Sequence, residues 1–497
     1  MKIFDKTFKL TLASVFLAEI LSFVGFLHPA AGRFFFLMIL LITLAASIYK
    51  LEYGLLAVLT ELFISSKGYL FSLSLGHFNL SIRIAMWLVV MLVWGVRFLS
   101  RLIREKRLSF GFDFSYFLPL FFFLGLGGLI GLLKGNGPAD AFFDYNNWFY
   151  FGLLLPLSEV FHENNFRKIF SVFSASIVWL AFETFSSLYL FSHNLFMRPV
   201  YKWIRNTGVG EITQMPNGFS RIFFQSHFFA LAAFFIFFLL FAGARLKKER
   251  SWPYFLVLTA SLASVLISFS RSFWVGLAGG VGLLLALAAG LIRKKKISWK
   301  DTLSFAGAGL ISLALSFAIM AAIVKFPFPR TGADLSDDLT NRLSNFSGEA
   351  AVSSRWSLLP ELWKGIKKDP LLGHGFGTTV TYKSSDPRVL ELHPDGLYTT
   401  YAFEWGWLDL WLKIGLLGVL AYLYLLFILS RRLWRRFSAG SDLLSAGFLL
   451  GILVMVLVNI FTPYLNHPLG IGYLLLAAVL AASPLQVRTD PHQSGRA

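Results

Sequence analysis

The sequence predicts an all-α, polytopic membrane protein with about fourteen transmembrane helices, within a range of roughly twelve to fourteen, and one large external loop. Of its 497 residues, 56% are hydrophobic and only 14% are charged, whereas soluble chains carry about a quarter charged residues. Apolar stretches of about 20 residues, the length that crosses a bilayer, recur along the chain. Short basic segments separate many of them, as is typical of cytoplasmic loops.

The apolar stretches predict the individual membrane spans. They cover approximately residues 10–28, 34–49, 51–66, 82–99, 114–133, 146–161, 169–191, 223–243, 253–270, 272–292, 302–325, 408–430, 442–462 and 468–484. The first stretch lacks a small-residue cleavage site, so we expect a helix and not a removed signal peptide. An even number of spans places both termini on one side of the membrane. The basic segments "RFLSRLIREKR", "ARLKKER", "RKKKISWK" and "SRRLWRRF" fall on that same side, which predicts that it is cytoplasmic.

The spacing of the spans predicts four regions. Residues 1–191 form an N-terminal transmembrane bundle, and residues 192–325 form a transmembrane core that includes a first external loop. Residues 326–407 form the large external, periplasmic loop, and residues 408–497 hold the C-terminal transmembrane helices and a cytoplasmic tail. We find no internal repeat.

Charge and motif content exclude several classes of function. The net charge of +18 would suggest a nucleic-acid partner in a soluble domain. Here the basic cytoplasmic loops account for it, and no nucleic-acid-binding motif is present, so we expect membrane lipids and no nucleic acid as partners. The absence of cysteine excludes disulfides, thiolate metal sites and a cysteine nucleophile. No HExxH, GxSxG or P-loop motif occurs, so we expect neither a metal nor a cofactor.

Two arginines lie at the predicted external ends of spans. Arg271, in "LISFSRSFWVGLAGG", would cost roughly 2.5–3.5 kcal/mol at the bilayer centre, but the span assignment places it in the outer turn between two helices. Gly276 and Gly280 form a GxxxG pair that predicts close packing of this helix pair. Arg221 precedes the span at 223–243 in the same way. Arginines on the external side oppose the positive-inside tendency and suit phosphate binding, although snorkelling or ion pairing would also explain them.

Three further features suggest chemistry at the same face. Glu404, in "YAFEWGWLDLWLKIGLLGVL", lies at helical spacing with Leu408 and Gly415. Its aromatic neighbours would raise its pKa toward that of a general base, although an ion pair with a nearby arginine or Lys413 is an open alternative. His393, in "LELHPDGLY", is either catalytic or a passive loop residue. The "LLGHGFGTT" turn contains three closely spaced glycines, namely Gly373, Gly375 and Gly377.

These residues carry a resemblance to a known family. The segments "GFSRIFFQSHFFALAAF", "SFSRSFWVGLAGG" and "SSRWSLLPELWKGIKKDPLLGHGFG", followed by "WLDLWLKIGLLGVLAYL", occur in this order over residues 200–430. Their order, spacing and common side resemble the bacterial O-antigen ligase/polymerase superfamily. The N-terminal half of the chain matches only in general hydropathy.

The resemblance implies a GT-C-like, metal-independent glycosyltransferase of the bacterial inner membrane, active in O-antigen or lipopolysaccharide biosynthesis. Its donor would be a glycan on undecaprenyl pyrophosphate, and an acceptor hydroxyl would attack the anomeric carbon at the periplasmic face. The family's arginines correspond to Arg221, Arg271 and Arg355, with Arg205 as a further candidate, and would bind the pyrophosphate. Gly373, Gly375 and Gly377 would shape the backbone near the sugar.

The sequence departs from the ligases at one position. The ligases have His followed by Asn, Ser or Gln eleven residues before the first glycine of GxxG, where this chain has Glu404 and Trp405. Either Glu404 is the base, or an insertion has displaced His393 from that place. The departure favours a polymerase that joins lipid-linked repeat units over a ligase that uses lipid A core as acceptor. A transporter or flippase for lipid-linked sugars and a protein O-oligosaccharyltransferase are further alternatives.

Overall fold

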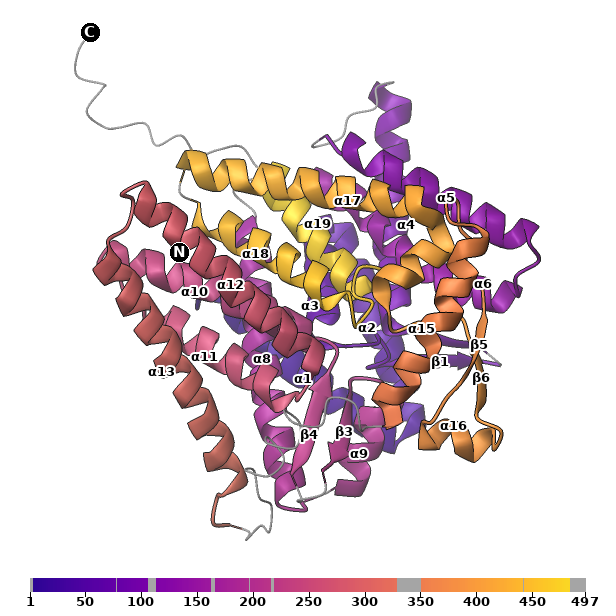
Figure 1. The fold of residues 1–497 in the computed structure, drawn as a ribbon, viewed down its shortest axis with the longest axis horizontal. Coiled ribbons are helices and arrows are strands. Elements are labelled where there is room, and N and C mark those ends of the chain that lie inside the picture. The colour runs from indigo at the N-terminus through magenta and orange to yellow at the C-terminus, as the bar shows by residue number, and fades with distance from the viewer. Residues whose placement is uncertain are drawn as a thin grey trace.

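The computed structural model describes residues 3–76, 78–105, 113–161, 166–195, 197–215, 219–328, 350–440 and 442–482. Over these residues the chain forms a bundle of helices with three small two-stranded sheets (Figure 1). The predicted all-α, polytopic membrane fold is confirmed. Residues 329–349 of the predicted external loop and the predicted tail from residue 483 lie outside the described residues.

Within the described ranges, nine helical segments are long and apolar enough to cross a membrane. These are α1 (Lys6–Leu27), α2 (Pro29–Tyr49), α4 (Ile82–Glu105), α5 (Leu118–Leu133) with the preceding turn η1 (Ser115–Phe117), α8 (Phe166–Ser192), α10 (His227–Leu246), α12 (Arg271–Arg293), α13 (Trp299–Val324) and α17 (Gly406–Gly440). Three apolar helices are shorter, namely α11 (Trp252–Ile267), α18 (Leu443–Val458) and α19 (Pro468–Ala482). The remaining predicted spans correspond to α3 (Leu51–Ile64) and to the consecutive short helices η2 (Asn146–Leu153) and α7 (Leu154–Val160). The number of fourteen crossings stays a prediction.

Short elements occupy the connections between these helices. The helices are α6 (Pro138–Tyr145), α9 (Met197–Asn206), α15 (Ala350–Lys368) and α16 (Pro387–Leu392). The strands pair as antiparallel hairpins, β1 (Ser72–Leu75) with β2 (Phe78–Ser81), β3 (Gly210–Gln214) with β4 (Ser220–Phe224), and β5 (Val380–Lys383) with β6 (Leu397–Thr400). Figure 1 shows β3, β4, α9 and α16 together at one end of the bundle.

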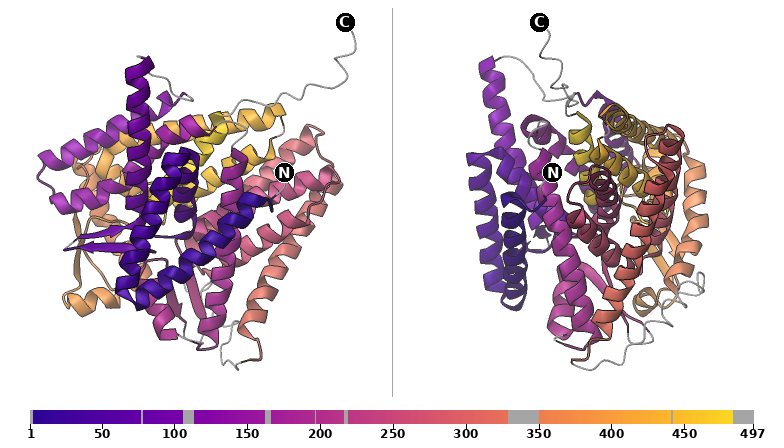
Figure 2. Two further views of the ribbon diagram at one scale, coloured as in Figure 1. Left: turned by 180° about the vertical axis from the view of Figure 1, so that it is seen from behind. Right: turned by 90° about the vertical axis from the view of Figure 1, so that its left-hand side faces the viewer.

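The centre of the bundle is made by helices that are apolar on every face. α10 reads "HFFALAAFFIFFLLFAGARL" and buries nearly all of its side chains against α11, α18 and α8. α12 and α13 instead bury only a small share of theirs inside the bundle. Figure 2 shows the N-terminal helices and the α15 segment on opposite flanks of this centre.

We call the end of the bundle that gathers the short basic connections the basic end; it holds the α4–α5, α10–α11, α12–α13 and α17–α18 connections. Arg432 of α17 pairs with Asp113, just before α5, at 3.0 Å. A Cβ on Gly243, near the end of α10, would lie 2.1 Å from Leu443 at the start of α18, and one pocket is lined by the end of α10 and the start of α13. The rings of Phe4 and Trp252 lie 6.4 Å apart, so the α10–α11 connection lies beside the first residues of the chain. These connections therefore lie at the same end of the bundle. That this end faces the cytoplasm stays a prediction.

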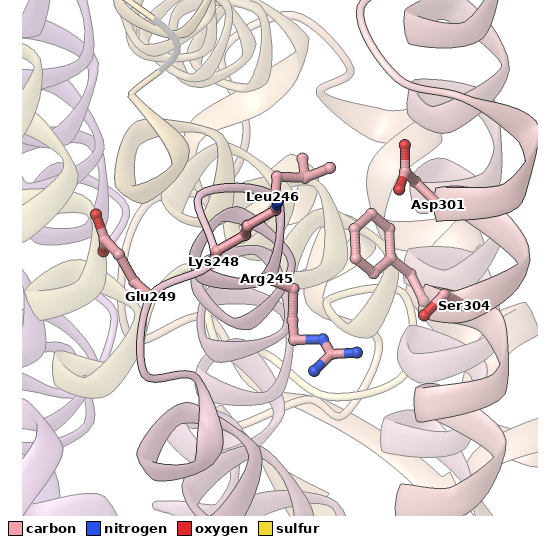
Figure 3. A pocket seen from close by; sticks show the side chains of 7 residues that line it. Arg245, Leu246, Lys248, Glu249, Asp301 and Ser304 are labelled. Carbon is pink, nitrogen blue, oxygen red and sulfur yellow. The ribbon is translucent and has the colours of Figure 1, made fainter.

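A pocket opens at the basic end between α10 and α13 (Figure 3). It mixes cations with carboxylates and contains none of the predicted site residues. Its lining consists of Arg245, Leu246, Lys248, Glu249, Asp301, Ser304 and Phe305.

The glycines of α12 pack against different helices from those that the sequence suggested. A Cβ on Gly276 would lie 2.6 Å from Val458 at the end of α18, and one on Gly280 would lie 2.2 Å from Phe235 of α10. The expected close packing is present, but its partners are α18 and α10 and not mainly the preceding helix α11. α11 is instead packed against α10, α13 and α8.

Helix α17 is interrupted at Gly415, whose φ of 68° and ψ of 176° are not helical. The segment that follows α15 supplies the hydrogen bonds that the break removes. The backbone N–H groups of His374 and Gly375 donate to the carbonyls of Leu412 and Lys413 at 2.7 and 3.0 Å. In return, the N–H of Leu416 donates to the carbonyl of Pro370 at 2.9 Å. Backbone hydrogen bonds at the break therefore join the segment that follows α15 to helix α17.

Candidate functional site

A pocket lies where α12, α15 and the start of α17 approach one another. Three of the predicted site residues, Arg271, Arg355 and Glu404, line it together. They are separated by up to 133 positions in the sequence, so the fold is what brings them together. The remaining lining residues are Ser272, Val275, Trp356, Trp405 and Phe461.

Arg271 is the first residue of α12, directly after the short turn that follows α11. Ser270 has an extended backbone and serves as the N-cap of α12. The hydroxyls of Ser270 and Ser272 lie 3.0 Å apart, and Thr462 donates to Ser272 at 3.1 Å. These contacts fix the first turn of the helix, and the side chain of Arg271 is partly exposed at the pocket.

Arg355 and Glu404 form an ion pair across the pocket. Their side chains are 41% and 51% exposed, so the pair is reachable from solvent. The indole Nε1 of Trp405 donates to the carbonyl of Arg355 at 2.9 Å, which ties α15 to the start of α17. The guanidinium partner stabilises the ionised carboxylate, whereas the apolar neighbours in the sequence suggested an environment that favours the neutral form.

The structure shows the surroundings of Glu404 that the sequence left open. Helix α17 begins at Gly406, two residues before the predicted span, so Glu404 lies just before the helix. Lys413 is not its partner, because Lys413 is buried and pairs with Asp144 and Asp409, both at 2.6 Å. Of the two ion pairs left open by the sequence, the one with an arginine is present.

Arg221 lies beside the pocket and not in its lining. It is on β4, and its Nε donates to the carbonyl of Ser268 at 2.8 Å. Its guanidinium also lies 4.9 Å from the ring centroid of Phe223. Ser268 belongs to the turn that leads into α12, so Arg221 contacts the segment that presents Arg271.

The structure does not bring Arg205 or His393 into the pocket. Arg205 ends α9 and lies 3.7 Å from the carboxylate of Glu211 on β3. His393 follows α16 and is exposed, and its backbone N–H donates to the carbonyl of Val389 at 2.7 Å. Neither contributes to the pocket lining.

The three predicted loop glycines lie at the break in α17 and outside the pocket lining. All have positive φ, 77° at Gly373, 81° at Gly375 and 78° at Gly377. A Cβ on Gly375 would lie 2.1 Å from the backbone nitrogen of Gly131 in α5. The close approach of this loop to other backbones explains why glycine occupies these positions. The three glycines thus contribute to the break in α17 and not to the wall of the pocket.

Sequence reasoning missed a buried charged cluster below this loop. Lys413 joins the carboxylates of Asp144 on α6 and Asp409 on α17, and Asp144 also accepts from the backbone N–H of Gly377 at 2.9 Å. All three charged side chains are less than a tenth exposed. Asp409 and Lys413 lie four residues apart within a predicted span, and that spacing was the available signal.

Two groups near the same loop have shifted pKa values. Lys134, at the end of α5, hydrogen-bonds to Asp369 and thereby lowers the pKa of that carboxyl. Burial, together with the negative charges of Asp144 and Asp140, raises the pKa of Tyr401. The loop is thus held to α5 and α6 by charge as well as by its backbone.

Comparison with known proteins identifies the part of the chain that carries the pocket. Residues 254–423 match the family model described as O-antigen ligase. This range contains Arg271, Arg355 and Glu404 but neither Arg205 nor Arg221. A comparison with curated proteins gives no match. The match over residues 254–423 supports the resemblance of this part of the chain to the O-antigen ligase/polymerase superfamily.

Proposed function

We propose that this protein transfers a glycan from undecaprenyl pyrophosphate to an acceptor hydroxyl at the periplasmic face of the bacterial inner membrane. The family supports a ligase- or polymerase-type function in general. The observation that carries the specific proposal is the shared pocket, in which two guanidinium groups and one carboxylate meet. A diphosphate leaving group requires the cations, and an attacking hydroxyl requires the base.

The proposed reaction is a single displacement at the anomeric carbon. The acceptor oxygen forms a bond to this carbon while the bond between the carbon and the diphosphate oxygen breaks. Arg271 and Arg355 stabilise the negative charge that develops on the diphosphate, because guanidinium groups bind phosphate oxygens in a fork. Glu404 takes the proton of the acceptor hydroxyl, so that undecaprenyl pyrophosphate and the elongated glycan are the products.

The Arg355–Glu404 ion pair gives these two residues a shared role. A diphosphate that binds between Arg271 and Arg355 competes with Glu404 for the Arg355 guanidinium. Loss of that partner makes the carboxylate a better proton acceptor. Donor binding therefore prepares the base, and we expect the donor to bind before the acceptor.

Arg221 is proposed to act through the turn before α12. Its hydrogen bond to the carbonyl of Ser268 holds this turn, and Arg271 follows three residues later. Arg205 lies further away, paired with Glu211. We therefore assign pyrophosphate binding to Arg271 and Arg355 and a supporting position to Arg221.

The location of Glu404 in the pocket favours it over His393 as the base, and this departure from the ligase pattern supports a polymerase of O-antigen or surface polysaccharide. The alternative acceptor is lipid A core, which would make the protein an O-antigen ligase. Product analysis with both acceptors distinguishes them. Elongated lipid-linked glycan is the polymerase product, and glycan on lipid A core is the ligase product.

The test is transfer by purified protein in detergent with an undecaprenyl-pyrophosphate oligosaccharide, measured as release of undecaprenyl pyrophosphate. We expect Glu404→Gln to lower kcat by about 100-fold or more, in the range of general-base catalysis. His393→Ala is the matched control, with a rate near that of the wild type. We also expect a chelator to leave the rate unchanged. Full activity of Glu404→Gln, or donor binding without turnover by the wild type, would contradict the proposal, and the latter would favour a transporter.

A further inference from the structure

The pocket has two chemically different walls. Arg271, Arg355 and Glu404 form the charged wall, and the rings of Trp356, Trp405 and Phe461 form an aromatic wall. The mechanism proposed above uses only the charged wall. The aromatic wall therefore has no assigned role.

The aromatic rings are held in place by one another. Trp356 and Trp405 meet edge to face with centroids 5.4 Å apart, and Trp405 lies 5.8 Å from Phe461. The hydrogen bond from the Trp405 indole to the carbonyl of Arg355 fixes the middle ring of the three. Trp356 itself is 55% exposed, although large apolar side chains in a packed wall are normally buried. It is thus a supported ring with surface available to a ligand.

The position of Trp356 suggests what that ligand is. It lines the same pocket as Arg355, so a group bound to this ring lies near a group bound to the guanidinium. A ligand that uses both walls carries negative charge at one end and an apolar face beside it. In a glycosyl diphosphate the first sugar has this property, because the C–H groups on one face of a pyranose pack on an aromatic ring while its hydroxyls remain free for polar partners.

We infer that Trp356 is the stacking platform for the first sugar of the donor, the one whose anomeric carbon bears the diphosphate. This assignment rests on the proposed glycan transfer. It makes the aromatic wall a sugar subsite that holds the reacting carbon beside Glu404. The choice of sugar then depends on which pyranoses present an apolar face to Trp356.

The experiment compares two ligands and three variants. The ligands are undecaprenyl-pyrophosphate oligosaccharide and undecaprenyl pyrophosphate without sugar, bound to detergent-purified protein in the absence of acceptor. The variants are Trp356→Leu, Trp356→Phe and the control Trp363→Leu. Trp363 is also in α15 and is 43% exposed, but it contacts Trp411 and does not line the pocket.

We expect Trp356→Leu to weaken binding of the glycan-bearing ligand about tenfold, while binding of the sugarless lipid is unchanged. Trp356→Phe retains an aromatic face and should bind both ligands nearly as the wild type does, as should Trp363→Leu. Unchanged binding of the sugarless lipid also shows that the leucine variant is folded.

Two results would overturn the assignment while leaving the proposed function intact. Equal weakening of both ligands in Trp356→Leu would show that the ring contacts the prenyl chain or supports the fold, and unchanged binding of both would show that it contacts neither. If the wild type binds neither ligand, the proposed function fails and the sugar subsite fails with it.

Discussion

At the scale of single residues, Arg271 shows what sequence can predict and Arg355 shows what it cannot. A charge is costly at the bilayer centre, so an arginine within a long apolar stretch is expected at the end of a helix. The structure has Arg271 at this place, as the first residue of α12. The partner of Glu404 is 49 positions away, in a different helix. No periodicity connects the two, and only the fold brings them together.

Lys413 provides a test of the buried cluster at this scale. It is 3% exposed between the carboxylates of Asp144 and Asp409. Lys413→Met leaves two carboxylates without their cation, and we expect a loss of about 3–5 kcal/mol in the free energy of unfolding. Thermal unfolding in detergent measures this loss.

The control for Lys413 removes the charges together. The triple variant Lys413→Met, Asp144→Asn, Asp409→Asn leaves no uncompensated charge and should recover part of the stability. If the single variant Lys413→Met is as stable as the wild type, the charged cluster does not stabilise the packing of α17 against α6.

At the scale of elements, the apolar stretches predicted every long apolar helix, and the predicted span at 408–430 begins within two residues of α17, but they did not predict the break inside that helix. The spacing of Glu404, Leu408 and Gly415 continues a helical pattern through a boundary at Gly406 and across the break at Gly415. The spacing of hydrophobic residues does not depend on the backbone angles of one residue, so it cannot indicate the break at Gly415. The break depends on hydrogen bonds from a loop about forty residues earlier, and these cannot be read from local sequence.

Gly375 tests the role of that loop. Its φ is 81°, and a Cβ added there would lie 2.1 Å from the Gly131 nitrogen, so the site has no room for a side chain. We expect Gly375→Ala to destabilise the protein by more than about 1–2 kcal/mol, the cost of a left-handed residue alone. Gly282→Ala is the matched control, because a Cβ there meets nothing within 4 Å and lies inside α12.

The two glycine variants are compared by thermal unfolding in detergent. Alanine at position 282 should be neutral or stabilising by up to about 1 kcal/mol, since alanine favours helix over glycine. Equal stability of Gly375→Ala and the wild type would mean that the loop can move away from α5 without cost, against the tight packing described above.

At the scale of the whole molecule, alternation of apolar spans and basic connections predicted the architecture, because the membrane imposes both. The orientation is a separate prediction that single-cysteine labelling can check. The chain has no cysteine, so one can be introduced without background. We expect a membrane-impermeant maleimide to label Leu392→Cys when supplied from the periplasmic side, whereas Lys296→Cys, at the basic end, requires access to the cytoplasm.

Both positions are exposed in the structure. A lack of labelling would therefore mean that the membrane separates the reagent from the cysteine, and not that the cysteine is buried in the protein. The unmodified protein should not be labelled under any condition. Labelling of Lys296→Cys from the periplasmic side would reverse the assignment and place the pocket at the cytoplasmic face.

The central claim is that the pocket of Arg271, Arg355 and Glu404 performs the glycan transfer. It is tested most directly by the rate of undecaprenyl pyrophosphate release from the lipid-linked donor, with Arg271→Ala beside the wild type. The control is Arg198→Ala, because Arg198 is an exposed residue of α9 that does not line the pocket. Loss of a group that stabilises leaving-group charge predicts a fall in kcat of about 100- to 1,000-fold for Arg271→Ala. The Arg198→Ala rate should remain near that of the wild type. Release by Arg271→Ala at the wild-type rate would contradict the account, because the reaction would then proceed without the arginine on which the pocket depends.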